Sequence, residues 1–389
     1  MIIQNIQLYT ILNSIGTTAI EVEMTSLEGY QTYASSPSAI IPGKRESKTT
    51  ININNRLFHK LTQELVNTEL NQEKLDNILK RYLNILGSDI CLSISLAFAR
   101  LNAIKEKCTL CTYISKQLSY NTKYKFPSPM VTLFSGGVHS HKKTIQNIMI
   151  VANTNSFSEN IRITSDIYSH IEKYLNSHNI LLGYGQSSGL ITNSLNTKQK
   201  LELISEIICS KDDYNTKTSI ALDIAAEHLL DSHKELYNLD GNFLTGSEMS
   251  SLLQQYINDF PISFVEDPFD SNDTELWKNF LSKNNNIQVV GDDLFATQCK
   301  FLDNQLANSI IIKMNQAGTL SETLKTIQQA KSLGMTFCVS HRSIETEDTF
   351  MCDLAVSMDA NYIKIGGPRR GDRISKYNRM IRLERNLKP

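Results

Sequence analysis

The feature that most constrains the fold is a series of short, apolar, β-rich runs that alternate with amphipathic stretches from residue 129 onward. The runs cover residues 130–134, 147–151, 180–183, 219–223, 262–266, 288–291, 310–313, 336–339 and 362–365. Strands separated by helices imply parallel pairing through right-handed crossovers. The series therefore predicts an α/β fold, namely a β/α barrel of roughly eight units. An open, doubly wound sheet is the alternative, but the sequence has no GxGxxG turn to support it.

The N-terminal part of the chain has a different pattern. Residues 4–12, 18–26 and 29–36 show β-branched and aromatic alternation, which predicts a three-stranded meander. Residues 57–117 show helical periodicity. We therefore expect an α+β capping domain at residues 1–122, followed at residues 123–389 by a barrel that carries the active site.

Charged residues end six successive barrel runs. The acidic ends are Asp223, Glu266 and Asp292, and the basic ends are Lys313, His341 with Arg342, and Lys364. Active sites of β/α barrels lie at the carboxyl ends of the strands, so these side chains should meet in one cavity. Three carboxylates at close quarters need a cation between them, and oxygen ligands favour Mg²⁺. The basic residues suit a phosphorylated or carboxylated ligand.

A structural explanation competes with this interpretation. A single Asp at a strand end is most often an N-cap for the next helix, and Asp267 before Pro268 is expected to be such a turn residue. Asp293 is expected to support its neighbour. Six charged ends in consecutive units, sorted into an acidic and a basic half, favour a binding site over a set of caps.

Composition narrows the class of partner. The chain has 39 basic and 40 acidic residues and a net charge of −1, which gives no reason to expect nucleic acid or a membrane surface. Seven cysteines in 389 residues do not form the pattern of a disulfide framework. We expect a cytoplasmic protein.

Several segments resemble the enolase family from end to end. They include FPISFVEDPFD at 260–270, VGDDL at 290–294, IKMNQAG at 312–318, VSHRSIETEDT at 339–349, IKIGGP at 363–368 and KYNRMIRLE at 376–384. The first hairpin at 16–23 and the segment FSGGVH at 134–139 are also similar to family segments. The resemblance implies an enolase-type barrel with an N-terminal capping domain, and a homodimer.

The resemblance also implies roles for matched residues. Asp223, Glu266 and Asp292 would bind Mg²⁺, and Lys313 would be the base that removes the proton next to the substrate carboxylate. Lys364 would neutralise that carboxylate and the enolate. The remaining substrate contacts would come from Arg342, Ser343, His341, Gln146 and the catalytic candidate His139. Nearby cations should lower the pKa of Lys313.

The sequence departs from the family where the chemistry occurs. Asn147 replaces one catalytic glutamate and Ser187 the other. One of the isoleucines Ile40 and Ile41 lies near the position of the loop serine that joins a second Mg²⁺, and Ser38 could replace that serine only if the loop has shifted by a residue or two. Neither an amide nor a hydroxyl can replace a carboxylic acid in expelling hydroxide, a contribution typically worth ~10²–10⁴-fold. His139 or His141 could supply the missing proton.

Three functions therefore remain open. The first is an Mg²⁺-dependent enzyme with altered chemistry on a phosphoenolpyruvate-like or phosphonate carboxylic acid, comparable to the carboxyphosphonoenolpyruvate synthases. The second is a weak or conventional enolase that dehydrates 2-phosphoglycerate. The third is an inactive paralogue that acts as a binding or scaffold protein. Survival of the cation ligands and the base favours an enzyme.

Overall fold

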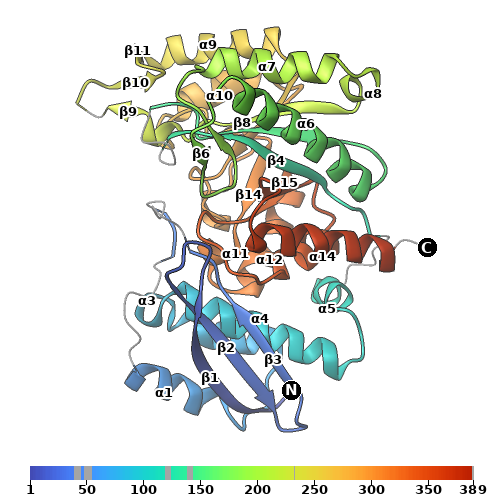
Figure 1. Ribbon diagram of the computed structural model, residues 1–389. Coiled ribbons are helices and arrows are strands. Elements are labelled where there is room, and N and C mark those ends of the chain that lie inside the picture. Colours follow the sequence, from blue (N-terminus) through green and yellow to red (C-terminus); the bar gives the residue numbers. More distant parts are fainter. Residues whose placement is uncertain (39–44, 48–54, 119–123, 138–142, 232, 388–389) are drawn as a thin grey trace.

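The computed structural model describes residues 1–38, 45–47, 55–118, 124–137, 143–231 and 233–387. Figure 1 shows an N-terminal domain of strands and helices below a larger barrel that is surrounded by helices. The predicted boundary at residue 122 falls in a segment outside the described residues and stays a prediction. Among the described helices, none is long and apolar enough to cross a membrane.

The N-terminal domain consists of an antiparallel meander packed against helices. The strands are β1 (Ile3–Leu12), β2 (Thr18–Ser26) and β3 (Gln31–Ser35), in the order β1-β2-β3. The helices are α1 (Asn55–Leu65), α2 (Gln72–Lys80), α3 (Leu83–Leu86), α4 (Ser88–Lys105) and α5 (Leu110–Lys116). Helix α4 is buried along most of its length, because it lies between the meander and the barrel. The predicted meander and helical region are confirmed.

Eight strands form the closed barrel. They are β4 (Ser128–Ser135), β5 (Asn147–Ala152), β8 (Thr218–Asp223), β12 (Ile262–Glu266), β13 (Gln288–Gly291), β14 (Ser309–Ile312), β15 (Thr336–Ser340) and β16 (Tyr362–Gly366). Strand β16 pairs with β4 and so closes the sheet, with Tyr362 opposite Ser128. Apolar side chains such as Met130, Phe264 and Ile311 fill the interior. The predicted fold class is confirmed.

Strand β5 corrects the expectation of parallel pairing throughout. It runs antiparallel to both β4 and β8, with Asn147 opposite both Ser135 and Asp223. The segment 136–146 that joins β4 to β5 is too short for a parallel crossover, which takes a dozen or more residues. As a result, the first residue of β5, and not its last, lies at the carboxyl end of the neighbouring β8.

The predicted strand at 180–183 is also corrected. Residues Gly183–Tyr184 form β6, a two-residue strand that pairs with β7 (Leu190–Ile191) beside β4. Leu182 is 61% exposed, so this apolar run does not enter the barrel. The hairpin instead carries the loop 185–189 toward the carboxyl end of the barrel.

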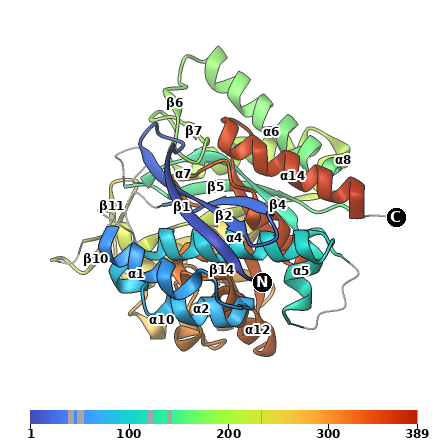
Figure 2. The ribbon, with the colours of Figure 1, turned by 90° about the horizontal axis from the view of Figure 1, so that it is seen from below.

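Helices surround the barrel, as Figure 2 shows from below. They are α6 (Phe157–Ser177), α7 (Thr197–Cys209), α8 (Asp212–Asn215), α9 (Gly246–Asp259), α10 (Thr274–Lys283), α11 (Met314–Ala317), α12 (Leu320–Ser332), α13 (Phe350–Ser357) and α14 (Gly371–Leu387). A small antiparallel sheet of β9 (Leu230–Asp231), β10 (Leu236–Leu239) and β11 (Asn242–Leu244) lies between β8 and α9.

A partly buried ion pair fixes the N-terminal domain on the barrel. Arg100 of α4 donates to both carboxylate oxygens of Asp348, at 2.7 and 2.8 Å. The backbone N–H groups of Ser35 and Phe350 donate to the same carboxylate, at 3.1 and 2.8 Å. Asp348 therefore joins β3 and α4 to the loop between β15 and α13, which also carries Arg342 and Ser343.

Candidate active site

The carboxyl ends of the barrel strands surround a cavity of about 90 Å³. Pockets for drug-sized ligands measure ~300–1,000 Å³, so this cavity suits a small, compact molecule. The predicted residues that line it are Gln146, Asn147, Ser187, Asp223, Asp292, Lys313, His341, Arg342, Ser343 and Lys364. Glu266 is buried behind this lining, 1% exposed. The barrel thus gathers residues that lie up to 218 positions apart in the sequence, from 146 to 364.

A chain of polar contacts crosses the floor of the cavity. Lys364 Nζ donates to Asp223 Oδ2 at 2.9 Å and to both oxygens of Glu266, at 3.0 and 2.8 Å. Asn147 Nδ2 donates to the same Asp223 Oδ2, at 2.9 Å. A carboxylate only accepts hydrogen bonds, so this contact fixes which end of the amide faces Asp223. Asn147 Oδ1 is buried and has no hydrogen-bond partner among the described residues.

The two carboxylates on this floor differ in acidity. Burial raises the pKa of Asp223, but Lys364 outweighs burial and holds the pKa below its usual value. Burial and the neighbouring Asp223 raise the pKa of Glu266 to about 8. One lysine therefore does not neutralise both groups, and the floor of the cavity favours further positive charge.

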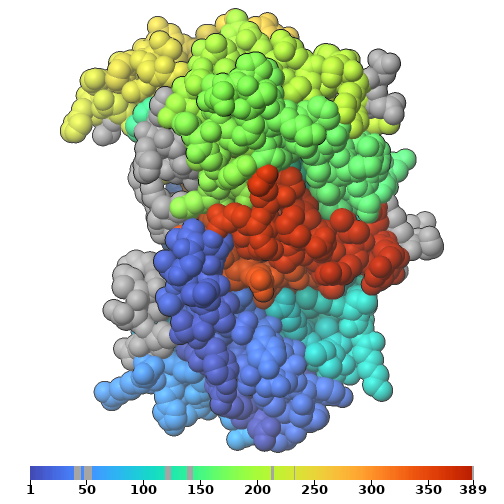
Figure 3. All heavy atoms as spheres, in the orientation of Figure 1, coloured from blue at the N-terminus to red at the C-terminus, as the bar shows by residue number. Residues whose placement is uncertain are grey.

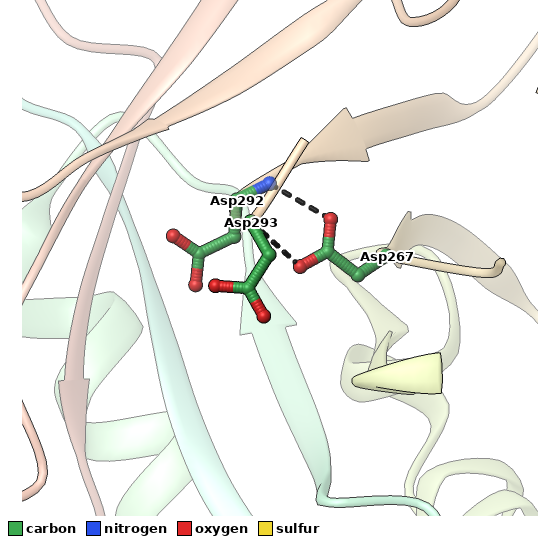
Figure 4. A group of neighbouring side chains, drawn as sticks. All are labelled: Asp267, Asp292 and Asp293. Atoms are coloured by element: carbon green, nitrogen blue, oxygen red, sulfur yellow. Dashed lines mark hydrogen bonds between the residues drawn. The ribbon is translucent and has the colours of Figure 1, made fainter. Parts of the chain in front are cut away.

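Three aspartates converge at the ends of β12 and β13. Figure 4 shows Asp267 beside Asp292 and Asp293. Asp267 Oδ1 accepts from the N–H of Asp292 and its Oδ2 from the N–H of Asp293, both at 2.9 Å. One carboxylate oxygen from each residue lies within 4.8 Å of the others. Asp267 has a φ of 44°, a turn conformation, and its contacts orient Asp292.

Lys313 stands beside this group. It follows β14, and its Nζ donates to Asp292 Oδ2 in a close ion pair. Burial lowers the pKa of Lys313, but Asp292 outweighs burial and raises it overall. The expectation of a lowered lysine pKa is therefore wrong for this arrangement, because the nearest charge is an anion.

The carboxylates around this cavity fit a hard divalent cation, and two observations support this. Asp292 Oδ1 is buried without a hydrogen-bond partner in the described part of the chain. Burial and the neighbouring Asp292 raise the pKa of Asp293 to about 7. Burial and a neighbouring carboxylate also raise the pKa of Glu266. Buried oxygen ligands with too little counter-charge are the donor set that Mg²⁺ takes in proteins.

The basic side of the cavity is held from behind by α14. Arg373 is fully buried and donates to the carbonyl oxygens of Arg342 and Ser343, both at 3.0 Å. It also approaches His341 Nδ1 closely. Burial, followed by Arg373, lowers the pKa of His341 well below its usual value, so this imidazole is neutral. Neutral His341 and cationic Arg342 both line the cavity.

Ser187 reaches the cavity because its loop packs closely against the neighbouring strands. A side chain at Gly189 would come within 2.4 Å of Ser135 Oγ, and one at Gly367 within 2.3 Å of the Ser188 carbonyl oxygen. Gly367 N–H donates to the Ser187 carbonyl oxygen at 2.7 Å. The loop 185–189 therefore lies against both β4 and β16, and Ser187 is 3% exposed at the cavity wall.

Some predicted residues are not placed in the cavity. His139 and His141 lie outside the described residues, and so do Ile40 and Ile41. Ser38 is described, and its backbone forms a bridge to Ile344, with hydrogen bonds of 2.9 and 3.1 Å. It does not belong to the described lining, which leaves its suggested role as a prediction.

Sequence reasoning missed Glu46. This residue lines the cavity and pairs with Arg342, but in the sequence it stands in a polar loop with no periodic or strand-end signal. Asp267 was expected only as a turn residue, and its contacts to Asp292 and Asp293 could not be foreseen without the register of β12 and β13. His228 and Ala225 also line the cavity without a sequence signal.

Comparison with known proteins agrees with this architecture. Residues 123–389 match the family described as "Enolase, C-terminal TIM barrel domain". Two curated relatives, both named "Enolase" and both from Ureaplasma parvum serovar 3, are each 34% identical to the chain over 432 residues. Each match covers 100% of this chain and 97% of the relative. The chain therefore belongs to the enolase family.

Proposed function

We propose that this protein is an Mg²⁺-dependent enzyme that binds phosphoenolpyruvate-like acids and forms an enolate from a 2-phosphoglycerate-like acid, but does not efficiently expel hydroxide. One observation carries the proposal. Asn147 and Ser187 are neutral and line the same cavity as Asp223, Asp292, Lys313 and Lys364. The groups that would hold an enolate are retained, whereas those that would act as acids are not.

The proposed roles follow from charge. Asp223, Glu266 and Asp292 would hold Mg²⁺, which when bound supplies positive charge for the oxygens of the substrate carboxylate. Lys313 would take the proton next to that carboxylate. Lys364 would place its ammonium at the carboxylate and enolate oxygens. Asn147 cannot exchange a proton, and the hydroxyl of Ser187 is too weak an acid to protonate a leaving hydroxide.

The ligand contacts would lie on the opposite wall. Arg342 and Ser343 would contact a phosphoryl or phosphonate group, with neutral His341 and Gln146 beside them. His139 is proposed as a further catalytic group on the strength of the family resemblance alone. Five acidic residues line the cavity against three basic ones, so an anionic ligand needs a bound cation to enter.

Binding and reaction can be tested separately. We expect calorimetry to show phosphoenolpyruvate binding in the presence of Mg²⁺, and Asp292→Ala to weaken it severely. Equal binding with and without Mg²⁺ would contradict the proposed cation site.

The reaction is tested with 2-phosphoglycerate in D₂O, followed by NMR. We expect exchange of the proton next to the carboxylate with little or no phosphoenolpyruvate formed, and loss of exchange in Lys313→Ala. Turnover at ordinary rates would show that the missing glutamates are not needed. Absence of both exchange and turnover would point to another substrate or to an inactive binding protein.

A conventional enolase is the second candidate. It is favoured by 34% identity to proteins named "Enolase" along the full length of the chain. The phosphonate-pathway alternative, comparable to carboxyphosphonoenolpyruvate synthase, would use the same cation site and the same base. The D₂O experiment separates these, because only the conventional enzyme releases phosphoenolpyruvate.

The family resemblance also supports a cytoplasmic homodimer with a domain boundary near residue 122. Exposed apolar side chains on the meander favour an interface there, namely Tyr9, Leu12, Ile15 and Tyr33. In Figure 3 these N-terminal strands lie beside the C-terminal part of the chain on one face of the molecule.

A further inference from the structure

Glu46 belongs to the N-terminal part of the chain but lies in the barrel cavity. Both of its carboxylate oxygens accept from Arg342 Nη2, at 2.9 and 2.8 Å. Its Oε1 also accepts from Gln316 Nε2, at 3.0 Å. Among the described residues, Arg342 Nη1 makes a single, long contact of 3.4 Å to Asn315 Oδ1. Glu46 is thus the principal counter-ion of Arg342.

The segment 45–47 is docked on the barrel on both sides of Glu46. Arg45 donates to the Leu294 carbonyl oxygen, and its guanidinium lies 4.8 Å from the centroid of the Phe301 ring. Ser47 donates to the Gln316 carbonyl oxygen at 2.9 Å. These contacts hold the carboxylate of Glu46 at Arg342.

Hydrogen bonds also join Glu46 to the segment that carries Lys313. Gln316, which donates to Glu46, accepts from Thr297 Oγ1 at 2.7 Å. Thr297 Oγ1 in turn accepts from the backbone N–H of Lys313 at 2.9 Å. The carboxylate is therefore part of the same network as the cavity wall.

Burial makes this pair electrostatically important. The side chains of Arg342 and Glu46 are 4% and 5% exposed. A buried charge needs a partner, and interactions between charges are strong where water is excluded. A phosphoryl dianion that approaches Arg342 meets a carboxylate already bound to the guanidinium.

We propose that Glu46 is a binding-site residue that opposes phosphate at Arg342 and so limits the affinity for phosphoryl groups, an inference that rests on the proposed function for its ligand class. A lone phosphate ion has only Arg342 and its neighbours to offset the repulsion from Glu46. A ligand that also carries a carboxylate gains a second anchor at Lys364 and the cation site. Glu46 thereby keeps the affinity for free phosphate low, whereas a bifunctional phosphorylated acid still binds through its second anchor.

The test is calorimetry with inorganic phosphate and with phosphoenolpyruvate, each in the presence of Mg²⁺. In Glu46→Gln the Kd for inorganic phosphate should fall by about tenfold or more, because one buried negative charge is removed. The Kd for phosphoenolpyruvate should fall as well. Glu46→Asp keeps the charge but withdraws it from Arg342, so its values should lie between those of the wild type and Glu46→Gln.

The matched control is Glu172→Gln. Glu172 also pairs with an arginine, Arg369, but it does not line the cavity, so neither Kd should change.

An unchanged or higher phosphate Kd in a folded Glu46→Gln protein would overturn the proposal and leave Glu46 as a support for Arg342. If Glu46→Gln does not fold, an unchanged or higher phosphate Kd in Glu46→Asp would overturn it. Phosphate binding distinguishes the role of Glu46 from the proposed function. If the wild type fails to bind phosphoenolpyruvate but Glu46→Gln binds phosphate more tightly, the proposed function is wrong and the role of Glu46 stands.

Discussion

At the scale of single residues, the cavity depends on side chains that orient other side chains. Asp267 uses one oxygen for each of the N–H groups of Asp292 and Asp293. An asparagine at this position could accept only one of these bonds and would place an N–H₂ group against the other N–H. Asp267 therefore matters to the cation site even if it does not touch the ion.

Asp267→Asn should weaken Mg²⁺ binding by about 10–100-fold, the usual effect of losing a partner that orients a ligand. Calorimetric titration of the protein with Mg²⁺ measures this. Asp270→Asn is a suitable control, because its side chain caps the following turn through Asn272. Equal Mg²⁺ affinity in the wild type and Asp267→Asn would rule out this role.

Asn147 and Ser187 define a second prediction at this scale. The double change Asn147→Glu with Ser187→Glu should raise dehydration of 2-phosphoglycerate by ~10²-fold or more, because it restores two acids. The new carboxylate at 147 would face Asp223 and add negative charge beside the cation site, so the variant should reach full activity at a lower Mg²⁺ concentration. Steady-state assays across Mg²⁺ concentrations check both effects. No gain with intact folding would mean that other groups limit the reaction.

At the scale of elements, the loop after β15 links the domains through Asp348. Burial raises the pKa of Asp348, but Arg100 and two backbone N–H groups outweigh burial and lower it below 3.8. A carboxyl whose folded-state pKa is lowered stabilises the fold fully above its unfolded-state pKa. This stability is then lost as the pH falls from about 5 through the lowered pKa.

Asp348→Asn should therefore cost roughly 2 kcal/mol at pH 7, because it removes the charge from a partly buried carboxylate that accepts several hydrogen bonds. Its stability should also fall less steeply below pH 5 than that of the wild type. Urea unfolding between pH 7 and pH 3 measures both. Glu28→Gln, which breaks the exposed pair with Lys105, should leave stability nearly unchanged, because solvent screens this pair. Parallel pH profiles for the wild type and Asp348→Asn would contradict this account.

The same scale shows what sequence patterns can and cannot predict. Short apolar runs that alternate with amphipathic stretches predicted seven of the eight barrel strands in the correct direction, because strand direction follows from a helical crossover. Strand β5 was assigned the wrong direction, although the segment 136–146 is too short for a parallel crossover and so already favoured an antiparallel pair. Asn147 nevertheless reached the cavity as the family resemblance implied. Glu46 could not be found, because its position depends on how a loop of one domain docks on the other.

At the scale of the whole molecule, the exposed apolar face of the meander supports the proposed homodimer. Leu12 is 72% exposed, and Tyr9 and Tyr33 are 45% and 46% exposed. Leu12 and Tyr33 also line a cavity of about 870 Å³ at the junction with the barrel, together with Glu21 and Arg100. An apolar patch rimmed by charged residues is typical of a protein interface.

Leu12→Asp should shift the protein from dimer to monomer, because it places a charge in the proposed apolar interface. Sedimentation velocity at several protein concentrations measures the change. Leu27→Asp is the control: Leu27 is 56% exposed but lies at the β2–β3 turn and does not line this cavity. A wild type that sediments as a monomer would remove the basis for the interface.

The pairing of β16 with β4 has a consequence for how the protein is made in a cell. Ser128 leaves the ribosome long before Tyr362. The edge of β4 that pairs with β16 therefore stays unpaired until β16 has been synthesised. Lys364 arrives with that last strand, and it contacts Asp223 and Glu266 on the cavity floor. A nascent chain therefore cannot complete the floor of the cavity before its last barrel strand has been synthesised.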